Sequence, residues 1–391
     1  MKEIYADNNA TTKVDEAVFE EMRPYFTELY GNPSSMHFFG GQVQKKVDEA
    51  RARVAALLGA APEEIVFTAC GTESDNAAIR SALEVFPERR HIITTRVEHP
   101  AVLTLCRNLV KKGYRVTELN VDGEGRLDLN ELRNAVDEDT AVVSIMYANN
   151  ETGVVFPIEE IGAVVKEKGK GALFHTDAVQ AVGKIPLNMA TSTIDMLSLS
   201  GHKLHAPKGI GALYLRKGVA FRPFMVGGHQ EKNRRAGTEN TSGVIALGKA
   251  CELAAKHMDE ENTRVKAMRD RLQKELLALI PAARINGGAA ERLPNTLSIA
   301  FEFVEGEAIL LLLSEKGICA SSGSACTSGS LEPSHVLRAM GVPFTCAHGS
   351  IRFSLSRFNT DQEIDAIISA LPPIIQRLRQ ISPFGRELLN K

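Results

Sequence analysis

Polar residues that could take part in chemistry follow five short apolar runs of this 391-residue sequence, each at the point where a run ends. The runs have the length and composition of buried strands, and helical patterns separate them. Because open α/β sheets bind ligands outside the carboxyl ends of their strands, we expect the five clusters to line one pocket. In chain order they are CGTESDN at 70–76, EHP with His99, ANNETG with Asn150, DAVQ with Asp177 and Gln180, and SGHK with Lys203.

Lys203 and Asp177 have residue types and positions suited to holding a ring cofactor. A lysine at the end of an apolar strand would be partly buried, which depresses its pKa and favours Schiff-base formation. A carboxylate at a strand end can pair with the protonated ring nitrogen of a pyridoxal cofactor. His99 could stack on the ring and shuttle protons. Each has a structural alternative: an ammonium extended to solvent for Lys203, a helix cap for Asp177 and a plain loop position for His99.

Gly71 and Thr72 open a predicted helix, where backbone N–H groups and a hydroxyl can hold a phosphate. The alternative is an ordinary cap or turn, which local pattern alone does not exclude. Lys208 is a second lysine of the SGHK segment, and we expect it in a loop.

Cys326 lies in ASSGSACTSGS at 320–330, a run of small residues with two glycines. Such a composition is typical of a mobile surface loop. An exposed thiol on a mobile loop could reach a substrate as a nucleophile, or it could be an ordinary surface cysteine. The other five cysteines show no CxxC spacing, so we expect no intrinsic metal site.

Seven apolar runs between residues 65 and 215 are predicted to be strands separated by helices, which gives an α/β domain with a mostly parallel seven-stranded sheet. A helix precedes them, with apolar residues at helical spacing until Gly59. The predicted strands are Ile65–Thr68, His91–Thr95, Arg115–Leu119, Ala141–Met146, Ala172–Thr176, Asp195–Leu199 and Gly211–Leu215.

The pattern changes beyond residue 245. An apolar stripe from Val265 to Leu279 predicts a long helix that Pro281 ends. Alternating apolar residues at 297–303 and 351–355 predict half-buried strands. We therefore expect a large α/β domain at 13–260 and a smaller α+β domain at 261–391, with residues 1–12 packing beside the smaller one.

Composition narrows the function classes. There are 46 Lys and Arg against 48 Asp and Glu, so the net charge of −2 would steer neither nucleic acid nor a membrane surface to the protein. The apolar stretch at 308–313 is too short to span a bilayer, and the first residues show no export signal. Six scattered cysteines form no disulfide framework, so we expect a cytoplasmic protein.

Taken together, these segments resemble the NifS branch of the pyridoxal-phosphate cysteine desulfurases, which are fold-type I enzymes. The resemblance runs in order over essentially the whole chain. The matching stretches are DNNATT at 7–12, GNPSS at 31–35, CGTESD at 70–75, VEHPAV at 97–102, ANNETG at 148–153, HTDAVQAVGK at 175–184, LSLSGHKLHAPKG at 197–209, RRAGTEN at 234–240, SSGSACTSGSLEPSHVLRAM at 321–340 and RFSLSR at 352–357.

The resemblance implies a homodimer that converts L-cysteine to L-alanine and leaves the sulfur on an enzyme cysteine as a persulfide. It implies pyridoxal 5′-phosphate as cofactor and an iron–sulfur scaffold protein as sulfur acceptor, with nitrogenase cluster assembly favoured over general supply. The implied cofactor residues are Lys203 for the Schiff base, Asp177 for the ring nitrogen, Gln180 and Asn150 for the ring hydroxyl, His99 stacked on the ring, and Gly71, Thr72, Ser200, His202 and the partner subunit's Thr238 for the phosphate.

For the substrate, the resemblance implies that Arg352 and Asn150 bind the carboxylate end and that Cys326 attacks the sulfur. Cys326 could also be a transient iron–sulfur ligand shared with the scaffold protein. Cys319 departs from the pattern, because a small residue usually stands there; we expect it to be packed, and sulfur exchange with Cys326 stays an alternative. The competing functions are a selenocysteine lyase, another fold-type I enzyme, or a degenerate scaffold without activity.

Overall fold

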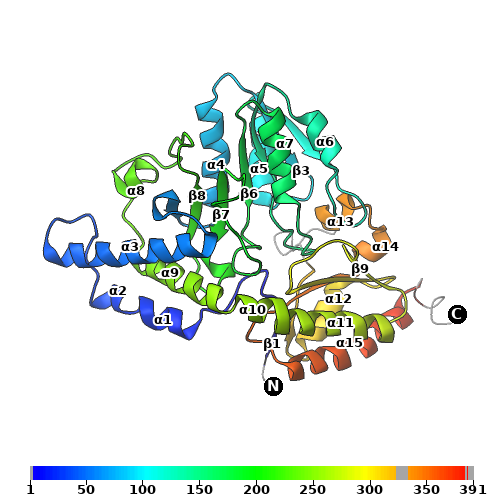
Figure 1. The fold of residues 1–391 in the computed structure, drawn as a ribbon. Coiled ribbons are helices and arrows are strands. Elements are labelled where there is room, and N and C mark those ends of the chain that lie inside the picture. The colour runs from blue at the N-terminus through cyan, green and yellow to red at the C-terminus, as the bar shows by residue number, and fades with distance from the viewer. Residues whose placement is uncertain (1–2, 323–332, 384, 386–391) are drawn as a thin grey trace.

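The computed structural model describes residues 3–322, 333–383 and 385, and its centre is a seven-stranded sheet (Figure 1). The strand order is β2-β8-β7-β6-β5-β3-β4, and only β8 runs antiparallel to its neighbours among these strands. This confirms the predicted mostly parallel sheet. The strands are β2 (Ile65–Thr68), β3 (His91–Thr95), β4 (Arg115–Leu119), β5 (Thr140–Ser144), β6 (Leu173–Asp177), β7 (Met196–Ser200) and β8 (Gly211–Leu215).

Helices cover both faces of this sheet because its strands are apolar on both faces. In β8, Ala212 and Tyr214 belong to one core, while Leu213 and Leu215 belong to the core on the opposite face. The first core contains α1 (Glu16–Met22), α2 (Pro24–Thr27), α3 (Phe38–Leu58), α6 (Leu129–Ala135), α7 (Ile158–Lys168) and α9 (Thr241–Lys256), and the second contains α4 (Gly71–Val85) and α5 (Pro100–Val110).

The predicted end of the long first helix is confirmed at Gly59. This glycine has φ 61° and its N–H bonds to the carbonyls of Ala55 and Ala56, which closes α3 in the left-handed conformation that glycine adopts without strain. The remaining short elements of this region are η1 (Pro62–Glu64), η2 (Gly201–Lys203), α8 (Gln230–Asn233), α10 (Met258–Glu260) and the π-helical turn η3 (Glu261–Val265).

A second, smaller sheet lies beside the first and has its own apolar core (Figure 1). It consists of three antiparallel strands in the order β12-β10-β9, and a separate pair joins β1 to β11 in parallel. The elements are β1 (Ile4–Tyr5), α11 (Lys266–Leu279), β9 (Ala283–Ile285), β10 (Thr296–Phe301), α12 (Gly306–Ser314), β11 (Ile318–Cys319), α13 (His335–Ala339), α14 (Phe344–Ala347), β12 (Ser350–Ser354) and α15 (Asp361–Ile381).

Two details of the predicted elements are wrong in this region. Leu279 is 50% exposed and does not belong to the buried stripe of α11, because the helix ends there. Phe303 lies beyond β10 with φ 65°, which takes it out of the strand pattern. The predicted domain bounds stay a prediction, and α13 and α14 contribute Val336 and Cys346 to the core of the large sheet.

No helix in the described part of the chain is long and apolar enough to cross a membrane.

Candidate active site

A cavity of about 270 Å³ lies at the carboxyl ends of the central strands, where the sequence placed its polar clusters. Elements of both sheets line it, since β12 of the smaller sheet reaches the same space. The structure thus brings together ten of the predicted site residues: Gly71, Thr72, His99, Asn150, Asp177, Gln180, Ser200, His202, Lys203 and Arg352.

Lys203 reaches the cavity from the tight turn η2, directly after β7. Gly201 makes this turn possible, because a Cβ there would lie 2.8 Å from the Cγ2 of Ile210. The Lys203 ammonium donates hydrogen bonds to the backbone carbonyls of Asn9 at 2.5 Å and Ala10 at 2.7 Å. The amine is therefore held inside the cavity by the N-terminal segment instead of extending to solvent.

Asp177 is the last residue of β6 and is almost fully buried in the cavity floor. Burial raises the pKa of its carboxyl, while the charges of His99 and Lys203 act in the opposite direction. Its Oδ1 accepts the backbone N–H of Val179 at 2.9 Å. Asp177 therefore also caps the turn that follows, which is close to the capping role considered for it from the sequence. A buried carboxylate of this kind is stabilised by a cation placed above it.

His99 caps α5, and its protonation follows from its hydrogen bond. Nδ1 accepts the backbone N–H of Ala101 at 3.1 Å, so the neutral ring carries its proton on Nε2. Burial lowers the pKa of His99 below its ordinary value; the negative charge of Asp177 opposes this effect and the positive charge of Lys203 adds to it. The lowered pKa favours the neutral ring near pH 7.

The beginning of α4 has the features of an anion site. Gly71 is its first residue, and a Cβ there would lie 2.7 Å from the Cγ2 of Val179, so a side chain would fill the space. Among the described residues, the buried Ser200 Oγ has no hydrogen-bond partner. Free N–H groups and the helix dipole attract an anion to such a helix start. Burial lowers the pKa of the nearby His202 to about 4, with Lys203 as the next cause.

Arg352 brings a fixed cation into the cavity from β12. Only 2% of it is exposed, and it donates to Asp7 Oδ1 at 2.7 Å and to the carbonyl of Asn150 at 2.8 Å. These bonds orient the guanidinium, whose planar fork matches a carboxylate.

Among the described residues, Thr238 is the predicted site residue that does not line this cavity, and it is exposed. Cys326 lies outside the described residues. Cys319 is half-buried in β11, and burial raises the pKa of its thiol.

Sequence reasoning missed several residues that line the cavity. His335 is one of them, and its Nε2 bonds to the carbonyl of Glu98 at 2.9 Å. Asp75 and Glu151 also line the cavity with ionisable side chains, and burial raises the pKa of both carboxyls. The available signal was their place within recognisable motifs: CGTESD at 70–75 for Asp75, ANNETG at 148–153 for Glu151 and the segment at 321–340 for His335.

Comparison with known proteins agrees with this geometry. The family model for class-V aminotransferases matches residues 4–367. A cysteine desulfurase of Trichormus azollae is 65% identical over 387 residues, covering 99% of this chain and 96% of that protein. Cysteine desulfurase NifS of Azotobacter vinelandii is 58% identical over 385 residues, with 98% and 95% covered. A solved structure of a NifS-like protein superimposes with a TM-score of 0.91 at 42% identity, covering 96% of this chain and all of that one.

The chain therefore belongs to the class-V aminotransferase family, whose members use pyridoxal phosphate. The residues of the cavity fit this cofactor. An amine, a buried carboxylate and a neutral imidazole surround the space for the ring, while the open start of α4 and the unpartnered Ser200 Oγ suit the phosphate.

Proposed function

We propose that this protein is a cysteine desulfurase that converts L-cysteine to L-alanine and transfers the sulfur to Cys326. The observation that carries the proposal is the single cavity that joins Lys203, Asp177, His99 and Arg352 in a chain of this family. The bound cofactor supplies an electron sink that weakens bonds around the substrate's α- and β-carbons. In the net reaction, the Cβ–S bond of cysteine breaks and a new S–S bond forms between that sulfur and the Sγ of Cys326. The proton of the Cys326 thiol replaces the sulfur on the carbon that becomes the methyl group of alanine.

Each residue of the cavity has a distinct task in this proposal. Lys203 supplies the amine for the Schiff base, and its contacts to the N-terminal carbonyls support this role because they hold the amine inside the cavity. Asp177 holds the proton on the ring nitrogen, while the neutral His99 can stack on the ring and accept a proton. The phosphate is held by the α4 start and the η2 turn, through Gly71, Thr72, Ser200 and His202.

The substrate carboxylate binds the Arg352 guanidinium, with Asn150 beside it. The ion pair with Asp7 holds that guanidinium in place.

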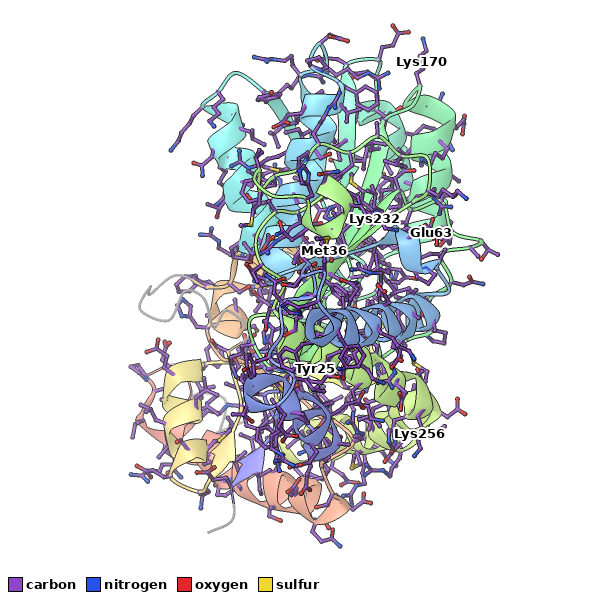
Figure 2. The ribbon with its side chains drawn as sticks, turned by 90° about the vertical axis from the view of Figure 1, so that its left-hand side faces the viewer. Tyr25, Met36, Glu63, Lys170, Lys232 and Lys256 are labelled. Carbon is purple, nitrogen blue, oxygen red and sulfur yellow. The ribbon has the colours of Figure 1, made fainter. Side chains whose placement is uncertain are left out.

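We also propose a homodimer in which Thr238 reaches the phosphate of the partner subunit. Large apolar residues are exposed near the segment that carries Thr238: Met36 fully, and Val226 at 86%. Met36 and Lys232 lie close together in the view of Figure 2, and the loops around them line one cavity with Ser34 and His229. A monomer would leave this apolar surface in water.

The sulfur acceptor in this proposal is an iron–sulfur scaffold protein in the cytoplasm, and the naming of the Azotobacter relative favours nitrogenase cluster assembly. The five described cysteines are free thiols, as is usual in a reducing compartment. A selenocysteine lyase would share the cavity residues, and the sequence around Cys326, with its small residues and its thiol, is what favours desulfuration.

Two experiments test this function. Borohydride reduction of the loaded enzyme, followed by peptide mapping, is expected to place the pyridoxyl group on Lys203, and a label on Lys208 would contradict the assignment. Cys326→Ala is expected to bind cofactor normally and to release no sulfide from cysteine, while the matched control Cys319→Ala keeps full activity. Sulfide release lost in the Cys319 variant and kept in the Cys326 variant would move the nucleophile to Cys319.

A further inference from the structure

Lys184 is a buried lysine next to the cofactor cavity, and the proposed reaction gives it no task. It lies in the turn after β6 that also carries Gln180, and only 6% of it is exposed. Lysine is rarely buried without a partner. Its Nζ donates to the side-chain Oε1 of Gln180 at 3.0 Å. Beside it is a small cavity of about 20 Å³, lined in part by Glu261, which has room for about one water molecule.

This contact fixes which way the Gln180 amide points. Its Oε1 accepts from Lys184, and its Nε2 donates to the backbone carbonyl of Asn9 at 3.0 Å. A flipped amide would place oxygen against the Asn9 carbonyl and an NH₂ group against the Lys184 amine. Both neighbours therefore require the same orientation, and one of the two Nε2 hydrogens is left for the cavity that Gln180 lines.

The same carbonyl links Lys184 to the reactive lysine. The Asn9 carbonyl accepts from Lys203 Nζ at 2.5 Å as well as from Gln180. When Lys203 gives its amine to the cofactor, the bonds from Lys184 through Gln180 to Asn9 still hold the amide. The orientation of Gln180 thus does not depend on Lys203 once Lys184 is in place.

We propose that Lys184 is a positioning residue: it orients the Gln180 amide so that an Nε2 hydrogen faces the ring oxygen of bound pyridoxal phosphate and stabilises the anionic form of that oxygen. This inference rests on the proposed role of Gln180 toward the cofactor. The other charged groups that act on Lys184 are Glu261 from η3, Lys203 from η2 and Arg352 from β12.

The protonation state of Lys184 does not decide the proposal. Burial lowers its pKa to about 7. The neutral amine still has N–H groups to donate to Gln180 Oε1, so the amide keeps its orientation on both sides of this pKa. The charged form adds polarisation, since a donor bonded to the amide oxygen makes the amide N–H a stronger donor.

The test is a pH titration of the visible absorbance of the loaded enzyme. Lys184→Met keeps the length of the side chain and removes the donor. Without it, the ring oxygen is stabilised less, so the midpoint of the titration is expected to rise by about one pH unit, a roughly tenfold change in proton affinity. The control is Lys208→Met, which removes an exposed positive charge from the loop after Lys203 and is expected to leave the midpoint unchanged.

A double-mutant cycle separates positioning from a merely structural role. In a Gln180→Leu background, Lys184→Met is expected to leave the midpoint unchanged, because the group that Lys184 positions is gone. Should Lys184→Met fail to fold, Lys184→Leu replaces it as a second variant without a donor, with the same expected rise. An unchanged midpoint in the single variant, or an equal rise in both backgrounds, would overturn the inference. A protein that forms no visible band with pyridoxal phosphate would instead contradict the proposed function itself.

Discussion

Replacing Asp177 by Asn is expected to change the apo and the loaded protein in opposite directions. The side chain ends β6 in the cavity floor, and burial raises the pKa of its carboxyl, so its negative charge is destabilising when no cation lies above it. Asparagine has nearly the same shape, and its Oδ1 can still accept the backbone N–H of Val179. The substitution therefore removes the charge and retains the local hydrogen bond.

The expected changes in stability and turnover follow from the burial of Asp177 and from its pairing with the bound cofactor. A folded pKa above the unfolded one means that the stability contributed by Asp177 is present below about pH 4 and is lost as pH rises through the folded pKa. At neutral pH the Asn variant of the apo protein should be more stable than the wild type, by about 1.4 kcal/mol for each pH unit by which burial raises the pKa of the carboxyl. With cofactor bound, the variant breaks a buried charge pair, which costs about 3–5 kcal/mol; the same loss in the transition state lowers turnover by roughly 10²–10⁴-fold.

Urea unfolding of the apo protein at pH 7 and the turnover of the loaded enzyme measure the two effects. The expected result is a higher unfolding midpoint together with a strongly reduced turnover. An apo variant less stable than the wild type, or a loaded variant with normal turnover, would refute the reasoning about this carboxylate.

Three further predictions concern other residues of the cavity and its surroundings. Gly71→Ala places a Cβ 2.7 Å from Val179 Cγ2, so equilibrium dialysis should show cofactor affinity reduced at least tenfold, with unchanged affinity contradicting the anion site. Arg352→Lys keeps the charge and loses the planar fork, so we expect a KM for cysteine raised about tenfold or more; an unchanged KM would count against carboxylate binding. Burial raises the pKa of Glu98 to about 8, so the buried carboxylate destabilises the wild type increasingly as pH rises towards that value. The free energy of unfolding of Glu98→Gln should therefore exceed that of the wild type by about 1.4 kcal/mol more for each unit from pH 5 to pH 8, and the difference should then level off. A difference that stays constant across this range would contradict the raised pKa.

The large sheet was predictable because its strands have local signals. Short β-branched runs, most of them apolar, predicted β2, β3, β4 and β8 with their observed bounds, and the other three strands to within one or two residues. Polar residues at the strand ends could be assigned to one cavity because parallel strands end at a common edge. The direction of β8 had no local signal, since an apolar run reads the same in either orientation.

The contacts that hold the site residues were not predictable from the sequence. The carbonyls of Asn9 and Ala10 bind Lys203 across more than 190 residues, and Asp7 pairs with Arg352 across 345. Such contacts depend on how the N-terminal segment crosses between the two sheets, and no local periodicity encodes it. The burial of Lys184 has the same origin, because a lysine four residues after Gln180 in a loop resembles any solvated lysine until the fold is known.

The most direct test of the account is a single turnover with L-cysteine in the absence of any reductant or sulfur acceptor. We predict one equivalent of alanine per active site, together with the mass gain of one sulfur atom on the peptide that contains Cys326. Alanine without added sulfur on that peptide, or a carbon product other than alanine, would contradict the proposal that this cavity and Cys326 act together as a desulfurase.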